Sequence, residues 1–160
     1  MDYYEDMEVG DVTEHGSKTM TKAEIIEFAT KYDPQPFHLD EEAAEETFFG
    51  GLAASGWHTA AVCMRLLVDG VLRDQASMGA AGVDELRWKR PVYPGDTLSV
   101  RVEVLEKEPD PNDPTRGRVR SRMTGLNQDG EPVISWAGLG LVARREPADT
   151  DADEENREGQ

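Results

Sequence analysis

The stretch 55–72, SGWHTAAVCMRLLVDGVL, decides the fold. Apolar residues recur along it at helical spacing, and a helix that is apolar around most of its circumference is usually buried. The apolar stripe consists of Trp57, Ala60, Ala61, Met64, Leu67, Val68 and Val71. Only His58, Arg65 and Asp69 form a narrow polar line. In a chain of 160 residues, the simplest way to bury such a helix is to wrap a sheet around it.

The sequence after this helix supplies the strands. Residues 97–106, TLSVRVEVLE, alternate between apolar and polar positions, which is typical of a half-buried antiparallel strand. The tetrapeptide QDGE at 128–131 predicts a tight hairpin turn in which Gly130 takes a positive φ. Residues 108–117, rich in proline and aspartate, predict a loop. The other predicted strands are 79–92, 117–126 and 132–145.

The sequence before the helix predicts a strand at 11–20 and a helix at 21–32. Thr21 can cap that helix with Glu24 three residues later, and Pro34 ends it. Asp40 can cap a second, short helix. The predicted class is therefore α+β, a single domain in which an antiparallel sheet curls around one long helix.

Charge limits the classes of partner. The formal net charge is −16, from 17 Lys and Arg against 33 Asp and Glu, and this field disfavours nucleic acid and anionic membranes. Only five of the cations are lysines. An acid-rich, lysine-poor surface leads to the hypothesis of a halophilic source, where salt screens the self-repulsion. The alternative is an ordinary acidic cytosolic protein.

The remaining composition predicts a cytoplasmic protein without disulfides. Cys63 is the lone cysteine, which excludes an intramolecular disulfide and the usual cysteine metal sites. The start, MDYYEDMEVGD, lacks the basic and apolar segments of a signal peptide, and no apolar run approaches the ~20 residues of a membrane helix. Residues 146–160 predict a disordered acidic tail after a domain at 1–145.

The stretch 32–40, YDPQPFHLD, separates Asp33 from His38 by a span that holds two prolines. One interpretation is a plain turn, and the other is an acid/base pair held by a stiffened loop. The glycine-rich stretch 49–57, FGGLAASGW, then leads into the long helix, whose free amides can stabilise a developing negative charge. Together these parts suit the addition or removal of water next to a thioester, through an enolate-like transition state.

These residues resemble a known family. Residues 28–59, FATKYDPQPFHLDEEAAEETFFGGLAASGWHT, are similar to the hydratase motif of MaoC-like dehydratases, hot-dog enzymes related to (R)-specific enoyl-CoA hydratases. Residues 87–104, RWKRPVYPGDTLSVRVEV, resemble a further part of the family pattern, and the resemblance covers roughly residues 8 to 145. The departures are Gln35 where the family often has Asn, Phe37 where it often has Ile, and Ser55-Gly56 where many members have His-Gly.

The resemblance implies a hydro-lyase that interconverts a 2-enoyl-CoA and an (R)-3-hydroxyacyl-CoA. It implies that Asp33 and His38 are the catalytic pair, that Gly56 offers its backbone amide to the thioester oxygen, and that Ser55 orients the site. It also implies a homodimer or higher homo-oligomer, in which two sheets join edge to edge and the pocket lies at the interface. Coenzyme A enters as part of the substrate, and no metal or redox cofactor is implied.

Substrate-binding residues are less sharply indicated. The cluster RWKR at 87–90 could hold the phosphates of coenzyme A and stack Trp88 on the base, or it could be a solvated strand face, and the arginines of 116–122 are a second candidate. Met64 is a further guess for an acyl tunnel. His58 fits a structural or pocket-lining role. The candidates are Trp57, His58, Phe48, Phe49, Arg87, Lys89 and Arg90.

Two rival functions stay open. A hot-dog thioesterase would usually carry a carboxylate on or beside the central helix, whereas here the first acid of that helix is Asp69. A non-catalytic acyl-CoA-binding module would keep the pocket without needing both Asp33 and His38.

Overall fold

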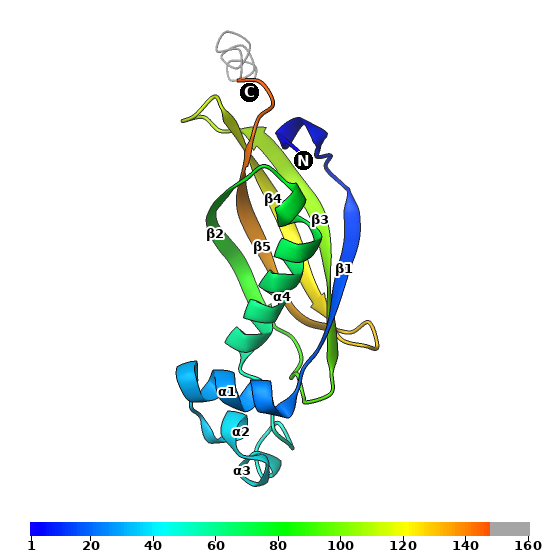
Figure 1. The fold of residues 1–160 in the computed structure, drawn as a ribbon, viewed down its shortest axis with the longest axis vertical. Helices are drawn as coiled ribbons and strands as arrows, with labels where there is room; N and C mark the ends of the chain where they lie inside the picture. Colours follow the sequence, from blue (N-terminus) through cyan, green and yellow to red (C-terminus); the bar gives the residue numbers. More distant parts are fainter. Residues whose placement is uncertain (148–160) are drawn as a thin grey trace.

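A long helix, α4, crosses one face of a curled antiparallel sheet, as Figure 1 shows. This computed structural model describes residues 1–147 of the chain. The five strands lie in the order β1-β3-β4-β5-β2, which leaves β1 and β2 at the edges. The arrangement confirms the predicted α+β class. In chain order the elements are η1 (Tyr4–Asp6), β1 (Val12–Thr19), α1 (Lys22–Tyr32), α2 (Pro36–Leu39), α3 (Glu41–Glu45), α4 (Gly56–Gly70), η2 (Leu72–Asp74), β2 (Ser77–Trp88), β3 (Thr97–Pro109), β4 (Arg116–Leu126) and β5 (Pro132–Ala143).

Helix α4 is buried on one side only. Cys63, Leu66 and Leu67 point into the main core, where they join apolar side chains of β3, β4 and β5. Trp57 and Met64 remain 57% and 44% exposed. The expectation that this helix is enclosed around most of its circumference is therefore wrong for the single chain. A sheet of five strands curls past one side of the helix and leaves its outer face open.

The strands follow the predicted alternation with local exceptions. In β3, Leu98 and Val100 are fully buried and Arg101 is exposed, and the β4–β5 turn places Gly130 at a φ of +72°. Strand β2 ends at Trp88, earlier than predicted, ahead of Pro91, whose missing N–H cannot join a ladder. A bulge in β2 gives Glu85 a φ of +55°.

That bulge turns two consecutive acids toward arginines of β4. Asp84 lies 2.9 Å from Arg120 Nη1, and Glu85 lies 3.4 Å from Arg122 Nη2. A regular strand would send neighbouring side chains to opposite faces, so the extra residue lets both acids meet cations on one face.

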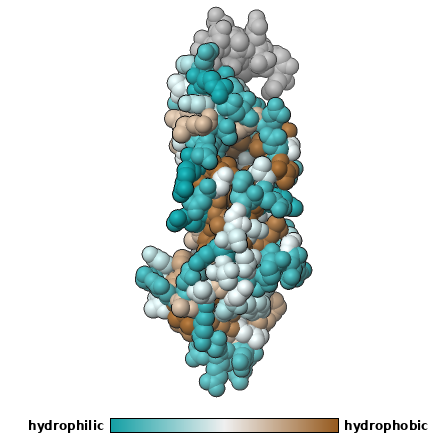
Figure 2. Space-filling view, turned by 45° about the vertical axis from the view of Figure 1, so that its right-hand side comes forward, coloured by the Kyte–Doolittle hydropathy of each residue, from teal (hydrophilic) through white to brown (hydrophobic). Residues whose placement is uncertain are grey.

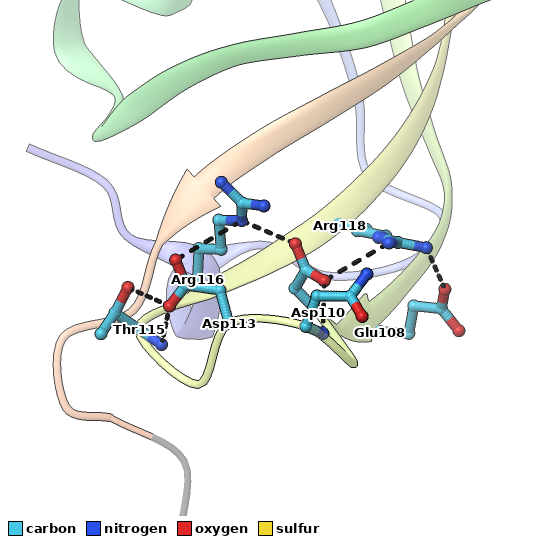
Figure 3. A network of polar contacts seen from close by, with 7 residues as sticks. Glu108, Asp110, Asp113, Thr115, Arg116 and Arg118 are labelled. Atoms are coloured by element: carbon cyan, nitrogen blue, oxygen red, sulfur yellow. Dashed lines mark hydrogen bonds and ion pairs between the residues drawn. The ribbon is translucent and has the colours of Figure 1, made fainter.

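The predicted loop after β3 is held by a polar network, drawn in Figure 3. The buried Asp110 carboxylate accepts a hydrogen bond from Arg116 Nε at 2.6 Å and lies 3.3 Å from Arg118 Nη2. Arg120 and Arg122 have the acidic partners in β2 described above. The arginines of 116–122 are thus engaged within the chain, which weakens their candidacy as a site for coenzyme A phosphates.

Helices α1, α2 and α3 gather at one end of the molecule (Figure 1), beside the start of α4. The Thr21 hydroxyl caps α1 by accepting from the Glu24 amide at 3.2 Å, and α1 ends at Tyr32, two residues before Pro34. Part of the stretch 32–40, interpreted from sequence as a turn or a stiffened loop, is instead one helical turn, α2, with Pro36 at its start. A turn of four residues is too short to show a helical period in sequence.

The last strand ends shortly before the predicted domain boundary, which stays a prediction. Strand β5 ends at Ala143, and the predicted boundary lies at residue 145. The predicted disordered tail lies, from residue 148 onward, outside the described residues. Within residues 1–147, no helix is long and apolar enough to cross a membrane.

Candidate active site

The structure brings Asp33 and His38 together. Asp33 caps the C-terminal end of α1, and His38 lies in the single turn of α2. The His38 Nε2 atom lies 3.4 Å from the Asp33 Oδ2 atom, and the two side chains are only 7% and 17% exposed. Pro34 and Pro36 stiffen the short connection between them. An acid and a base therefore meet in one fixed, largely buried position.

A backbone carbonyl sets the tautomer of His38. Its Nδ1 atom lies 2.6 Å from the carbonyl oxygen of Ala53. A carbonyl can only accept, so Nδ1 must carry a proton. In the neutral ring, Nε2 is then the atom with the free lone pair, and it is this atom that faces Asp33. The imidazole is oriented as a base toward the carboxylate.

Two side chains hold the Asp33 carboxylate. Ser55 Oγ donates to Oδ2 at 2.7 Å, and Gln35 Nε2 donates to Oδ1 at 2.6 Å. Burial raises the pKa of Asp33, but these hydrogen bonds and the neighbouring His38 outweigh it, so the pKa lies below its usual range. Asp33 is therefore ionised at neutral pH.

The N-terminal end of α4 completes the site. The Ser55 carbonyl accepts from the amides of His58 and Thr59, whereas the amides of Gly56 and Trp57 belong to the helix start, where no intrahelical acceptor exists. A methyl group on Gly56 would lie 2.4 Å from Trp88 Nε1, so only glycine fits without a shift of the indole. This end of the helix can stabilise negative charge on a bound group.

A cavity of about 470 Å³, the site cavity, joins these groups. The residues named from sequence that line it are Asp33, His38, Gly56, Trp57, Phe48, Phe49, Trp88, Lys89 and Arg90. Ser55 acts from behind, through Asp33. Sequence reasoning missed Gln35, Phe37 and Thr59 as lining residues; Thr59 lies one turn after Ser55 and Gly56, which is the signal that could have found it.

Two of the seven substrate-binding candidates, His58 and Arg87, do not line the site cavity. His58 is 7% exposed and stacks on Phe28 of α1 with 4.7 Å between ring centroids, and burial lowers the pKa of its imidazole. It packs α1 onto α4, in line with the structural role considered for it. Arg87 donates from Nη1 to the Leu86 carbonyl.

A second hollow of about 520 Å³ lies along the C-terminal half of α4. Its floor is mostly apolar and includes Met64, Val71 and Trp136, so Met64 belongs to this hollow and not to the site cavity. Figure 2 shows apolar surface reaching the outside over the middle of one face, between hydrophilic margins. His15 and Asp11 line this second hollow.

The described part of the chain contains no cluster of side chains suited to bind a metal ion. Among residues 1–147, no group of three or more His, Cys, Asp and Glu side chains is placed to hold a metal ion. The buried Cys63 thiol has its pKa raised to about 12 by burial, which keeps it protonated and unreactive.

The chain is similar to known proteins over most of its length. The family model described as "MaoC like domain" matches residues 6–124. A 3-hydroxybutyryl-CoA dehydratase of Methylorubrum extorquens is 35% identical over 92% of this chain and 88% of its own length. The crystal structure of a MaoC-like dehydratase from Rhodospirillum rubrum superposes with a TM-score of 0.85 and 45% identity, covering 91% of this chain and 99% of that one.

A further solved structure is an unliganded (R)-hydratase, PhaJ1 of Pseudomonas aeruginosa. It has a TM-score of 0.68 and 31% identity, and the match covers 91% of this chain and 88% of that chain. The fold is the hot-dog fold, a sheet wrapped around a long helix. The chain therefore belongs to the MaoC-like dehydratase family and is an enzyme of the hydro-lyase class.

Proposed function

We propose that the protein reversibly hydrates a 2-enoyl-CoA to an (R)-3-hydroxyacyl-CoA. The observation that carries this proposal is the 3.4 Å approach of the His38 Nε2 atom to the ionised Asp33 carboxylate, in a cavity that also contains the start of α4. The named hydratase and dehydratase relatives support the reaction class.

In the proposed mechanism, one water molecule binds between Asp33 and His38. Nε2 takes a proton from it while its oxygen forms a bond to C3 of the substrate, and the C2–C3 π electrons move toward the thioester oxygen. The imidazolium, stabilised by the Asp33 charge, then returns the proton to C2. Water is thus added without any net change in the enzyme, and both new bonds form on one face of the double bond.

The transition state carries negative charge on the thioester oxygen. We place this oxygen at the amide of Gly56, where the first turn of α4 leaves N–H groups without helical acceptors. Ser55 does not touch the substrate in this scheme. It keeps the Asp33 carboxylate turned toward His38.

The mouth of the site cavity suits a coenzyme A thioester. Trp57 and Phe48, 57% and 93% exposed, offer apolar surface at its rim. Arg90 is paired with Glu131 at 3.0 Å, whereas Lys89 has no carboxylate partner within residues 1–147 and is free to meet a phosphate. On a chain of net charge −16, such a local cation is needed for an anionic carrier.

We also propose that two copies pair along β2. This edge strand is 12 residues long, and it carries the exposed Met78, Val83 and Trp88 beside the open face of α4. An unpaired apolar edge is a template for pairing with another chain. The opposite edge, β1, has a polar exterior and is a weaker candidate.

Matched edge variants test the pairing. Val83 of β2 and Val12 of β1 are both 53% exposed. Val83→Lys should convert a dimer to a monomer, because it places a charge in the apolar contact, and Val12→Lys should leave the mass unchanged. Light scattering coupled to gel filtration measures both. A dimer that survives Val83→Lys, or that is lost only in Val12→Lys, would refute pairing through β2.

One assay separates the proposed function from its rivals. Hydration removes the enoyl absorbance of crotonyl-CoA, and a thioesterase instead releases a free thiol. The structure favours hydration, because Asp69, the first acid of α4, is engaged by Arg65 and Arg73. Thiol release without loss of the enoyl absorbance would overturn the proposal in favour of hydrolysis. Binding without either reaction would favour a non-catalytic module.

A further inference from the structure

The nitrogen edge of Trp88 rests on the first residue of α4. The atoms nearest to a methyl group built on Gly56 would be Nε1 at 2.4 Å, Cε2 at 2.5 Å and Cδ1 at 2.8 Å, all in the five-membered ring. Trp88 and Gly56 both line the site cavity. The indole N–H and the free amide terminus of the helix are therefore neighbours in the same wall.

This indole N–H lacks a partner within the described chain. No carbonyl, hydroxyl or carboxylate of residues 1–147 accepts a hydrogen bond from it. An indole nitrogen can only donate a hydrogen bond. Trp88 is 47% exposed and lines the site cavity. A ligand that enters the cavity can supply an acceptor in place of solvent.

A second tryptophan holds the ring in place. Trp57 meets Trp88 edge to face, with 5.0 Å between ring centroids and 84° between planes. Trp57 is the second residue of α4 and also lines the cavity. The pair thus couples the end of β2 to the start of α4 and limits the freedom of the Trp88 ring.

We infer that the Trp88 indole N–H is a second hydrogen-bond donor to the thioester oxygen, acting beside the Gly56 amide. This inference rests on the proposed hydration. Two converging neutral donors would share the charge that reaches the oxygen as the enolate-like state forms, and such preorganised donors contribute strongly to catalysis. A role in stacking on the base of coenzyme A would use the ring face instead, and phenylalanine would preserve that face.

A binding experiment tests the contact without any reaction. Butyryl-CoA carries the thioester oxygen, and its thioether analogue S-butyl-CoA lacks it. We expect the wild-type protein to prefer the thioester, and Trp88→Phe to reduce this preference roughly three- to tenfold, the effect of one neutral hydrogen bond. Trp136→Phe, the same substitution in the second hollow, is the matched control and should keep the preference. Calorimetry measures both affinities in each variant.

Kinetics give the second readout. Trp88→Phe should lower kcat for crotonyl-CoA at least about tenfold with a smaller change in KM, because the contact strengthens in the transition state. Trp88→His, which retains a ring N–H, should recover part of the loss. Circular dichroism checks that each variant is folded.

The outcomes separate this inference from the proposed function. An unchanged kcat and thioester preference in Trp88→Phe would overturn the inference, and so would equal losses in Trp136→Phe and Trp88→Phe. If the wild-type protein does not hydrate crotonyl-CoA, the proposed function is overturned. If Trp88→Phe nevertheless reduces the preference for the thioester, the contact between the indole N–H and the thioester oxygen is still supported.

Discussion

The two hollows of the molecule lie at opposite ends of α4 and differ in content far more than in size. The site cavity measures about 470 Å³ and the second hollow about 520 Å³. Each contains a histidine and an aspartate. In the site cavity, His38 and Asp33 meet at 3.4 Å, whereas in the second hollow His15 Nε2 bonds the Thr13 hydroxyl at 2.7 Å.

The comparison shows that the reactive site is distinguished by polar groups that lie close together, and not by the volume of the cavity. The second hollow has the larger apolar floor but lies beside the C-terminal half of α4, where helix carbonyls would repel an oxyanion. The site cavity lies at the start of the same helix, where amides attract it. One helix therefore gives its two ends opposite electrostatic characters.

The largest expected effect tests the acid/base pair directly. Asp33→Asn and His38→Ala should each lower kcat/KM for crotonyl-CoA hydration by about two decades or more, the contribution of a positioned acid or base. The matched variants of the second hollow, Asp11→Asn and His15→Ala, should stay within about threefold of wild type. If kcat/KM fell by a similar factor in both sets of variants, Asp33 and His38 would not be the specific acid/base pair of the reaction.

The next effect compares two glycines. A methyl on Gly56 would meet Trp88 at 2.4 Å, whereas a methyl on Gly138, in the second hollow, would meet Trp136 no closer than 3.8 Å. Gly56→Ala should lower kcat/KM at least about tenfold, because the Trp88 ring must move away from the helix start. Gly138→Ala should have little effect. Full activity in a folded Gly56→Ala protein would argue against a thioester bound at the helix start.

A smaller effect concerns pH. The Ser55 hydrogen bond helps to lower the pKa of Asp33, and activity should fall as pH drops through that pKa and the carboxylate is protonated. Ser55→Ala removes a bond to the charged form, so the acidic limb of kcat/KM should move to higher pH, with a modest loss on the plateau. Ser77→Ala, in the second hollow, is the control. An acidic limb that stays in place would show that Asp33 does not control it.

The smallest expected effect concerns the acidic surface of the whole protein, outside both hollows. If the halophilic hypothesis holds, the melting temperature should rise by a few degrees as potassium chloride increases, because salt screens the repulsion within a chain of charge −16. Thermal melts across a salt series measure this. A melting temperature that falls steadily with added salt would reject the hypothesis.

The fold was predictable where patterns are long. The 15 residues of α4 and the alternation of β3 extend over enough positions for their periods to be read. The turn of α2 and the bulge at Glu85 were not predictable, because each depends on one or a few residues whose conformation is set by tertiary partners.

The identities of the main site residues could be predicted from the sequence, but the geometry of the site could not. Prolines around Asp33 and His38 indicated a fixed pose, but the bonds that orient them come from Ser55, which is 22 residues away from Asp33, and from the carbonyl of Ala53. Sequence spacing holds no signal for such contacts. The exposed face of α4 was also not predicted. A pattern of apolar residues predicts that a helix is buried, but it does not show whether the same chain or a second chain covers it.

The close sequence spacing of Asp33 and His38 has a consequence for genetics. Acid, base and helix terminus all belong to one chain, so an assembly of copies would contain as many acid/base pairs as it has subunits. Mixing a chain inactivated at Asp33 with one inactivated at His38 would therefore restore nothing, and one dead subunit in a pair would halve the output without silencing its neighbour. Alleles damaged at these two positions should fail to complement each other.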